Sequence, residues 1–148
     1  PFIKDNGVPA TTYRTWPGYI FKRNMQRLGI QYDTMRFSDK IKAKNKLDAI
    51  LDSGKPVGLV TSVFYLDYLP EAFKFHFNAH NITIFGKQDD RYLVSDPVLE
   101  NTDSIVDSSL ERARFAKGLL APNGKMYYIK SVPKPLDFKM ELNNLFFL

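Results

Sequence analysis

The chain has 148 residues, 44% of them hydrophobic and 25% charged, a composition typical of one globular domain with a buried core. No apolar run reaches the roughly 18 residues of a membrane span, and the N-terminus shows no secretory signal, so we favour a cytoplasmic location. The net charge is +5, but the basic residues are dispersed. Their densest group, at 40–46, is typical of a solvated helix face, so we expect no nucleic-acid binding.

The first part of the chain predicts an irregular segment followed by a helix. Residues 5–18 are rich in turn-forming residues. Residues 19–28 carry apolar side chains at helical spacing, and Gly29 is typical of a helix end. We expect a short strand over residues 31–37.

The next part predicts a helix, a buried strand and a loop. Ser38 or Asp39 is a suitable N-cap, and Gly54 ends the helix. Its apolar stripe consists of Ala43, Leu47, Ile50 and Leu51. Residues 56–64 are too apolar to alternate and predict a central strand. The aromatic segment 65–77 predicts a covering loop.

The remaining sequence predicts an antiparallel cluster with one inserted helix. Residues 80–86 and 91–97 flank a charged turn at 87–90, which indicates a β-hairpin. A short helix is expected over 106–118 and a strand over 124–132. Helices followed by an antiparallel cluster indicate an α+β fold.

The ends of the predicted hairpin bring a histidine and an aspartate together. Asp96 follows His80 by 16 residues with the hairpin between them, and antiparallel partners lie side by side. If both side chains face the same side, the carboxylate orients one ring nitrogen and the other can take a proton from a nucleophile. The alternative is a structural histidine followed by an Asp-Pro turn.

The sequence around this pair resembles a known family. It resembles the N-terminal domain of the butirosin biosynthesis protein H family in four segments: GKPVGLVTSVFYLDYLP, AHNITIFG, RYLVSDP and LERARFA. That family is related to papain-like peptidases of the bacteriocin-processing (C39) type. The resemblance runs from about Leu47 to Val132 and implies a single papain-like domain over 1–148. It also implies a cysteine acyltransferase that moves an acyl group from an acyl-carrier protein to an amine, with His80 as general base and Asp96 as its orienting residue.

The chain departs from the family pattern at two points. The family's cysteine lies near the start of its domain, and this chain contains no cysteine. The proline of the family's Tyr-Leu-Pro-Tyr segment is Asp67 here. Since Pro1 is not an initiator methionine, we expect a fragment that lacks the N-terminal nucleophile helix and is inactive alone. The alternatives are a C39-like peptidase and a non-catalytic papain-like domain that binds a peptide or acyl chain.

The aromatic loop supplies the candidates for substrate contact. Tyr65, Tyr68 and Phe77 are predicted to line a groove for a peptide or acyl substrate, with an acyl-carrier protein as the possible partner. We expect no cofactor.

We expect no metal site either. His76 and His80 lie four apart, as in a helical zinc pair, but the residues that follow are strand-like and no third ligand is evident. Ser62 is a poor nucleophile candidate because it lies in an apolar strand without flanking elbow glycines.

Overall fold

The computed structural model describes residues 2–5, 8–11 and 18–133. Its contacts divide the chain into two units, Pro1–Gln31 with Ser131–Leu148, and Tyr32–Lys130. A single domain over the whole chain stays a prediction. In the described residues, no helix is both long enough and apolar enough to span a membrane.

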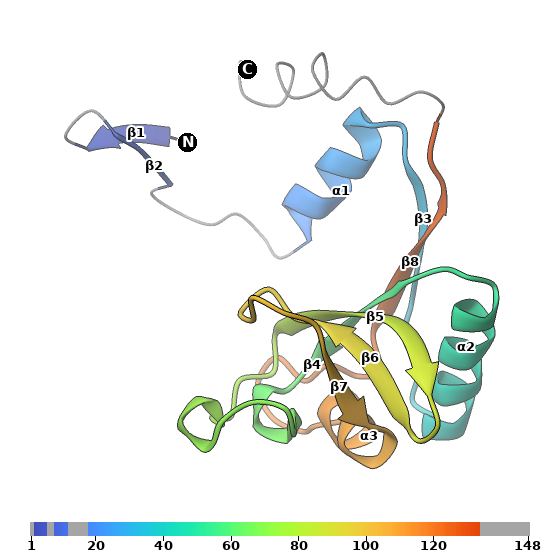
Figure 1. Cartoon of the computed structure of the whole chain (residues 1–148). Coiled ribbons are helices and arrows are strands. Elements are labelled where there is room, and N and C mark those ends of the chain that lie inside the picture. The colour runs from blue at the N-terminus through green and yellow to red at the C-terminus, as the bar shows by residue number, and fades with distance from the viewer. Residues whose placement is uncertain (1, 6–7, 12–17, 134–148) are drawn as a thin grey trace. The chain divides into compact units, whose positions relative to one another are not determined.

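The first unit contains a small hairpin and a helix (Figure 1). Strands β1 (Phe2–Asp5) and β2 (Val8–Thr11) pair antiparallel, so the irregular structure expected from residue 5 onward was wrong at β2. The rest of that expected segment lies partly outside the described residues. Helix α1 (Tyr19–Arg27) is confirmed. Gly29 follows it with a φ of 63°, the left-handed conformation that glycine adopts at helix ends.

The second unit is built on a six-stranded sheet with the order β3-β8-β4-β5-β6-β7. The strands are β3 (Gln31–Met35), β4 (Val57–Thr61), β5 (His80–Gln88), β6 (Arg91–Ser95), β7 (Asp103–Val106) and β8 (Met126–Ser131). Strand β4 pairs antiparallel with both β5 and β8, and β6 pairs antiparallel with β5 and β7. The α+β prediction is therefore confirmed.

Two helices pack on this sheet (Figure 1). Helix α2 (Lys40–Asp52) is N-capped by Asp39, whose side chain accepts a hydrogen bond from the backbone of Lys42 at 3.0 Å. Helix α3 (Asp107–Arg114) is shorter than predicted, because the chain leaves the helix at Phe115. Two 3₁₀ turns, η1 (Val63–Tyr65) and η2 (Glu71–Phe73), follow β4. The loop predicted over 65–77 includes the last residue of η1 and the whole of η2.

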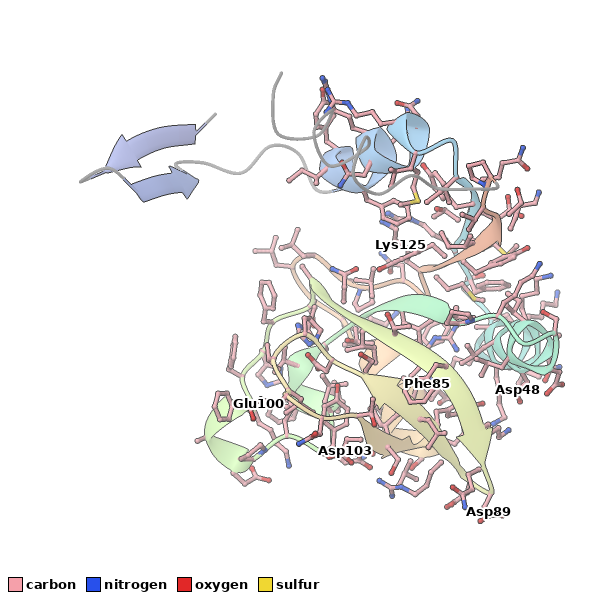
Figure 2. The ribbon with its side chains drawn as sticks, turned by 45° about the horizontal axis from the view of Figure 1, so that its top comes forward. Asp48, Phe85, Asp89, Glu100, Asp103 and Lys125 are labelled. Carbon is pink, nitrogen blue, oxygen red and sulfur yellow. The ribbon has the colours of Figure 1, made fainter. Side chains whose placement is uncertain are left out.

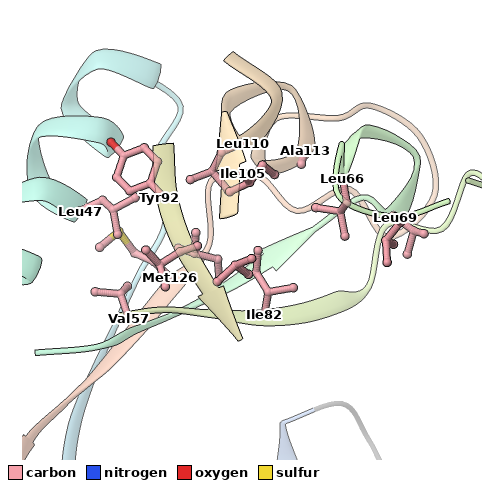
Figure 3. Close-up of a cluster of buried hydrophobic side chains, with 14 of the residues drawn as sticks. Leu47, Val57, Leu66, Leu69, Ile82, Tyr92, Ile105, Leu110, Ala113 and Met126 are labelled. Atoms are coloured by element: carbon pink, nitrogen blue, oxygen red, sulfur yellow. The ribbon is translucent and has the colours of Figure 1, made fainter. Parts of the chain in front are cut away.

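The core lies between the helices and one face of the sheet (Figure 3). Sheet residues at every second position are buried there, together with Leu47 from α2 and Leu110 from α3. These sheet residues are Val57, Leu59, Ile82, Ile84, Tyr92, Val94, Ile105 and Met126. Period-two burial on one face is the pattern of a sheet covered on that side.

Strand β5 carries one extra residue. Ile84 pairs with Val94 and Gly86 pairs with Leu93, so Phe85 has no residue opposite and forms a bulge. Figure 2 labels Phe85 on β5 and Asp89 at the turn. The strand continues to Gln88, so the turn is only two residues long, rather than the four predicted.

Candidate functional site

The buried face of the sheet ends in polar side chains. Thr61 follows Val57 and Leu59 at the same period on β4, and it lies opposite His80 in the β4–β5 register. Thr83 lies opposite Ser95 in the β5–β6 register. Asp96 follows Ser95, one residue beyond the end of β6, and therefore lies diagonally across from His80. His80 and Asp96 therefore occupy the end of the face that elsewhere holds the core.

The two predicted catalytic side chains are in contact. His80 Nε2 lies 2.8 Å from Asp96 Oδ2, within hydrogen-bonding distance. The Asp96 side chain is fully buried, and the His80 side chain is 13% exposed. The predicted geometry is confirmed, while a catalytic role for the pair stays a prediction.

Asp96 accepts three hydrogen bonds. Besides His80, the Tyr68 hydroxyl donates to Oδ2 at 2.6 Å, and the backbone N–H of Val98 donates to Oδ1 at 3.0 Å. Burial is the largest single effect and raises the pKa of Asp96. The three hydrogen bonds and the electrostatic attraction of His80 together outweigh burial and hold this pKa below its ordinary value. The carboxylate is therefore ionised at neutral pH.

These partners fix where the protons lie. Burial, reinforced by the bond to Asp96, raises the pKa of Tyr68, so its phenol stays protonated and donates. An ionised carboxylate can only accept, so the His80 nitrogen that faces it, Nε2, carries a hydrogen. Nδ1 is then the ring nitrogen with a lone pair in the neutral imidazole, and it is the atom suited to receive a proton.

The turn after β6 orients the carboxylate. The bond from the Val98 N–H to Asp96 Oδ1 closes an Asx turn around Pro97, and the Leu99 N–H donates to the Asp96 carbonyl at 3.0 Å. The Asp-Pro dipeptide is a sequence signal for this turn. No sequence signal identified Tyr68 as a partner of Asp96.

The three predicted substrate-contact residues lie in different surroundings. The Tyr68 hydroxyl is engaged by Asp96. Tyr65 packs against the core, with the Arg112 guanidinium 5.6 Å from its ring centre. Phe77 is 40% exposed, and its ring centre lies 6.2 Å from that of Phe75. Substrate binding by these residues stays a prediction.

His76 and Ser62, the candidates that the sequence argued against, both make packing or hydrogen-bonding contacts. His76 stacks on Phe64 with ring centres 4.0 Å apart. In the part of the chain that the structure describes, no three His, Asp or Glu side chains gather as a metal site would require. Ser62 is fully buried, and its backbone N–H donates to Ala113 of α3.

Asp67 joins the aromatic loop to β7. Its Oδ2 accepts a hydrogen bond from the backbone N–H of Val106 at 3.2 Å. Proline has no side-chain acceptor and could not make this contact. The contact with Val106 therefore anchors the segment that carries Tyr68.

Comparisons with known proteins agree with this architecture. Residues 1–97, which include His80 and Asp96, match the family described as butirosin biosynthesis protein H, N-terminal. The fold is similar to that of a protein described as a C39-like peptidase from Bacillus anthracis, with a TM-score of 0.54 and 15% identity. The similarity covers 83% of this chain and 63% of that one, so the chain spans less than two thirds of its structural neighbour. No curated protein matches the chain. The predicted papain-like fold is confirmed.

Proposed function

The chain belongs to the family of the N-terminal domain of butirosin biosynthesis protein H, and on that premise we propose that its papain-like domain supplies the base of a cysteine-dependent acyl- or peptidyl-transfer reaction. The observation that carries the proposal is the contact between His80 and the buried, ionised Asp96. This pair leaves one imidazole nitrogen, Nδ1, available for proton transfer.

The chemistry proceeds in two proton-coupled steps. Nδ1 of His80 takes the proton of a thiol, and the thiolate attacks the carbonyl carbon of a thioester or amide. The imidazolium then returns the proton to the departing sulfur or nitrogen, and the acyl group stays on the thiol. An acceptor amine, or water for a peptidase, releases it in the second step. Asp96 stabilises the imidazolium in both steps.

The thiol is not among the 148 residues, because the sequence contains no cysteine. We therefore propose that this chain contributes the base and its orienting carboxylate, and that it does not form an acyl adduct alone. For the substrate we propose an acyl group held on a carrier protein, or a peptide.

An exogenous thiol tests the proposal. The chain is mixed with a phenyl thioester and N-acetylcysteamine, and the rate of acyl exchange is followed. Because the free thiol is not positioned, we expect the rate to exceed that of H80A by about tenfold, below the roughly 100-fold or more of a fully assembled general base. H76A, which removes the other histidine, should behave like the wild type. Equal rates for the wild type and H80A would contradict the proposal.

A second candidate function is a non-catalytic binding domain. The absence of any cysteine favours it. In that case the exchange rate would not depend on His80, while a peptide or acyl ligand would still perturb the amide spectrum of the aromatic segment at 65–77.

A further inference from the structure

Three hollows in the surface of the second unit meet around one aromatic side chain. Phe115 and Lys117 line all three, whose volumes are about 460, 280 and 330 Å³. Neither His80 nor Asp96 lines any of them. We call this group of hollows the Phe115 pocket. Its other lining residues are Arg36, Phe37, Ser38, Asp39, Lys40, Ile41, Tyr65, His76, Arg112, Ala116 and Asn123.

The Phe115 pocket carries a large excess of positive charge. Four lining residues are cationic, Arg36, Lys40, Arg112 and Lys117, and only Asp39 is acidic. The Asp39 carboxylate already caps α2 through the Lys42 N–H. Lys40 pairs with Glu111, which lies just outside the lining, at 2.8 Å.

Within the part of the chain that the structure describes, the other three cations lack acidic partners. Arg112 donates to the neutral Ser109 hydroxyl at 3.2 Å, and its guanidinium lies over the Tyr65 ring. Among the residues that the structure describes, neither Arg36 nor Lys117 forms a salt bridge. Among the described residues, three of the four cations around Phe115 are thus left without an acidic partner.

The start of α2 adds to this potential. A helix N-terminus carries partial positive charge and is normally accompanied by acidic residues. The first turn of α2 holds no acidic residue and instead carries Lys40 and Lys42. The Asp39 carboxylate at the N-cap compensates this charge only in part.

The walls of the pocket are held by buried contacts. Asn78 is 8% exposed, and its side-chain amide donates to the carbonyls of Lys117 and Leu119 at 3.1 and 2.9 Å. A Cβ at Gly124 would lie 2.9 Å from the Phe115 ring, so that ring is packed closely against the backbone. The cations therefore project from a preformed frame.

We propose that the Phe115 pocket binds a phosphate monoester. The planar guanidinium of Arg112 offers paired donors that suit phosphate oxygens, while Lys40 and Lys117 supply point charges. The excess of cations matches a dianion better than a singly charged carboxylate. Phe115, Tyr65 and Ala116 give the organic part of the ester apolar contact. The proposal goes beyond the transfer chemistry and does not depend on His80.

Three probes test the ligand class. Phenyl phosphate, inorganic phosphate and benzoate are titrated separately into the ¹⁵N-labelled chain, and the amide shifts of Phe115, Ala116 and Lys117 are followed. We expect saturable shifts, with phenyl phosphate the tightest and benzoate at least about tenfold weaker, since the loss of one charge-assisted bond costs about that factor. Benzoate binding as tightly as phenyl phosphate, or shifts that do not saturate, would overturn the proposal.

Matched variants test the site. R112Q/K117Q removes two exposed charges from the pocket. K55Q/K130Q removes the same number of charges from residues that line none of the hollows. Phenyl phosphate should bind at least about tenfold more weakly to the first variant and normally to the second. R112K keeps the charge and loses the paired donors of the guanidinium, so its affinity for phenyl phosphate should be intermediate. Equal weakening in both double variants would reduce the effect to net charge and refute the site. H80A should bind as the wild type does.

Discussion

Tyr68 lies 2.6 Å from Asp96 through its hydroxyl and donates to the same oxygen that faces His80. One carboxylate oxygen thus receives a hydrogen bond from a loop and another from the first residue of β5. This arrangement makes Tyr68 a positioning residue, because it acts on the imidazole only through the carboxylate.

Replacing Tyr68 tests that role. Y68F removes a donor that lowers the pKa of Asp96, so the pKa of Asp96 should rise. The free energy of unfolding should fall by about 1–3 kcal/mol, as for other buried acceptors that lose a partner. A ¹³C NMR titration of the Asp96 carboxyl carbon measures the first effect, and urea unfolding measures the second. Y65F serves as the control. An unchanged Asp96 titration would show that the Tyr68 hydroxyl does not act on the carboxylate.

The pH dependence of stability tests the ionised carboxylate. Because the pKa of Asp96 is lowered in the folded state, its contribution to stability is fully present above the unfolded aspartate pKa of about 3.9. That contribution is lost as the pH falls through the lower folded value. D96N should therefore be less stable than the wild type at neutral pH by about 1–3 kcal/mol, and the difference should shrink below about pH 4. Urea unfolding at several pH values checks this, and a difference independent of pH would contradict it.

The position of the His–Asp pair could be predicted because it depends on local rules. Buried apolar residues recur at every second position in β5 and β6, which sets the face of each side chain. His80 and Asp96 fall in phase with the buried residues, and a short hairpin brings them together. The sequence therefore carried enough information for this contact.

The contribution of Tyr68 could not be predicted, because its position depends on contacts distant in the sequence. Leu66 and Leu69 are buried on either side of it, and Asp67 is bound to Val106. None of these contacts follows from the pattern of the loop itself. Strand β7 was missed for a related reason: Asp103 and Ser104 are polar, and the strand forms only because β6 offers its edge.

Gly58 provides a test of packing on the other face of the sheet. It pairs with Tyr127, and a Cβ at this position would lie 2.2 Å from the Tyr127 ring. The ring must move to accommodate it, so G58A should destabilise the protein by about 1–3 kcal/mol. In Y127S the ring is absent, so G58A has nothing to clash with. The loss of stability from Y127S to G58A/Y127S should therefore be much smaller than the loss from the wild type to G58A. Thermal and urea unfolding of the four proteins measure this. Additive losses would argue against a direct clash.

The bulge on β5 provides a test of register. Deleting Phe85 should close the ladder without changing which residues pair, because Ile84 already lies opposite Val94 and Gly86 opposite Leu93. The His80–Asp96 bond should survive, as seen in the ¹⁵N shifts of the His80 ring. Deleting Ser95 should break it, because Asp96 would move to the opposite face. Loss of the bond in the Phe85 deletion would show that the bulge itself holds the register.

The distance between His80 and Asp96 along the chain includes one residue that the ladder does not use. A relative with a regular ladder would hold the same two side chains together with one residue fewer between them. A search for this pair by fixed spacing would miss such a protein, although its site would be equivalent. The reliable marker is the phase of each residue against its buried neighbours, with one residue of tolerance in the interval between them.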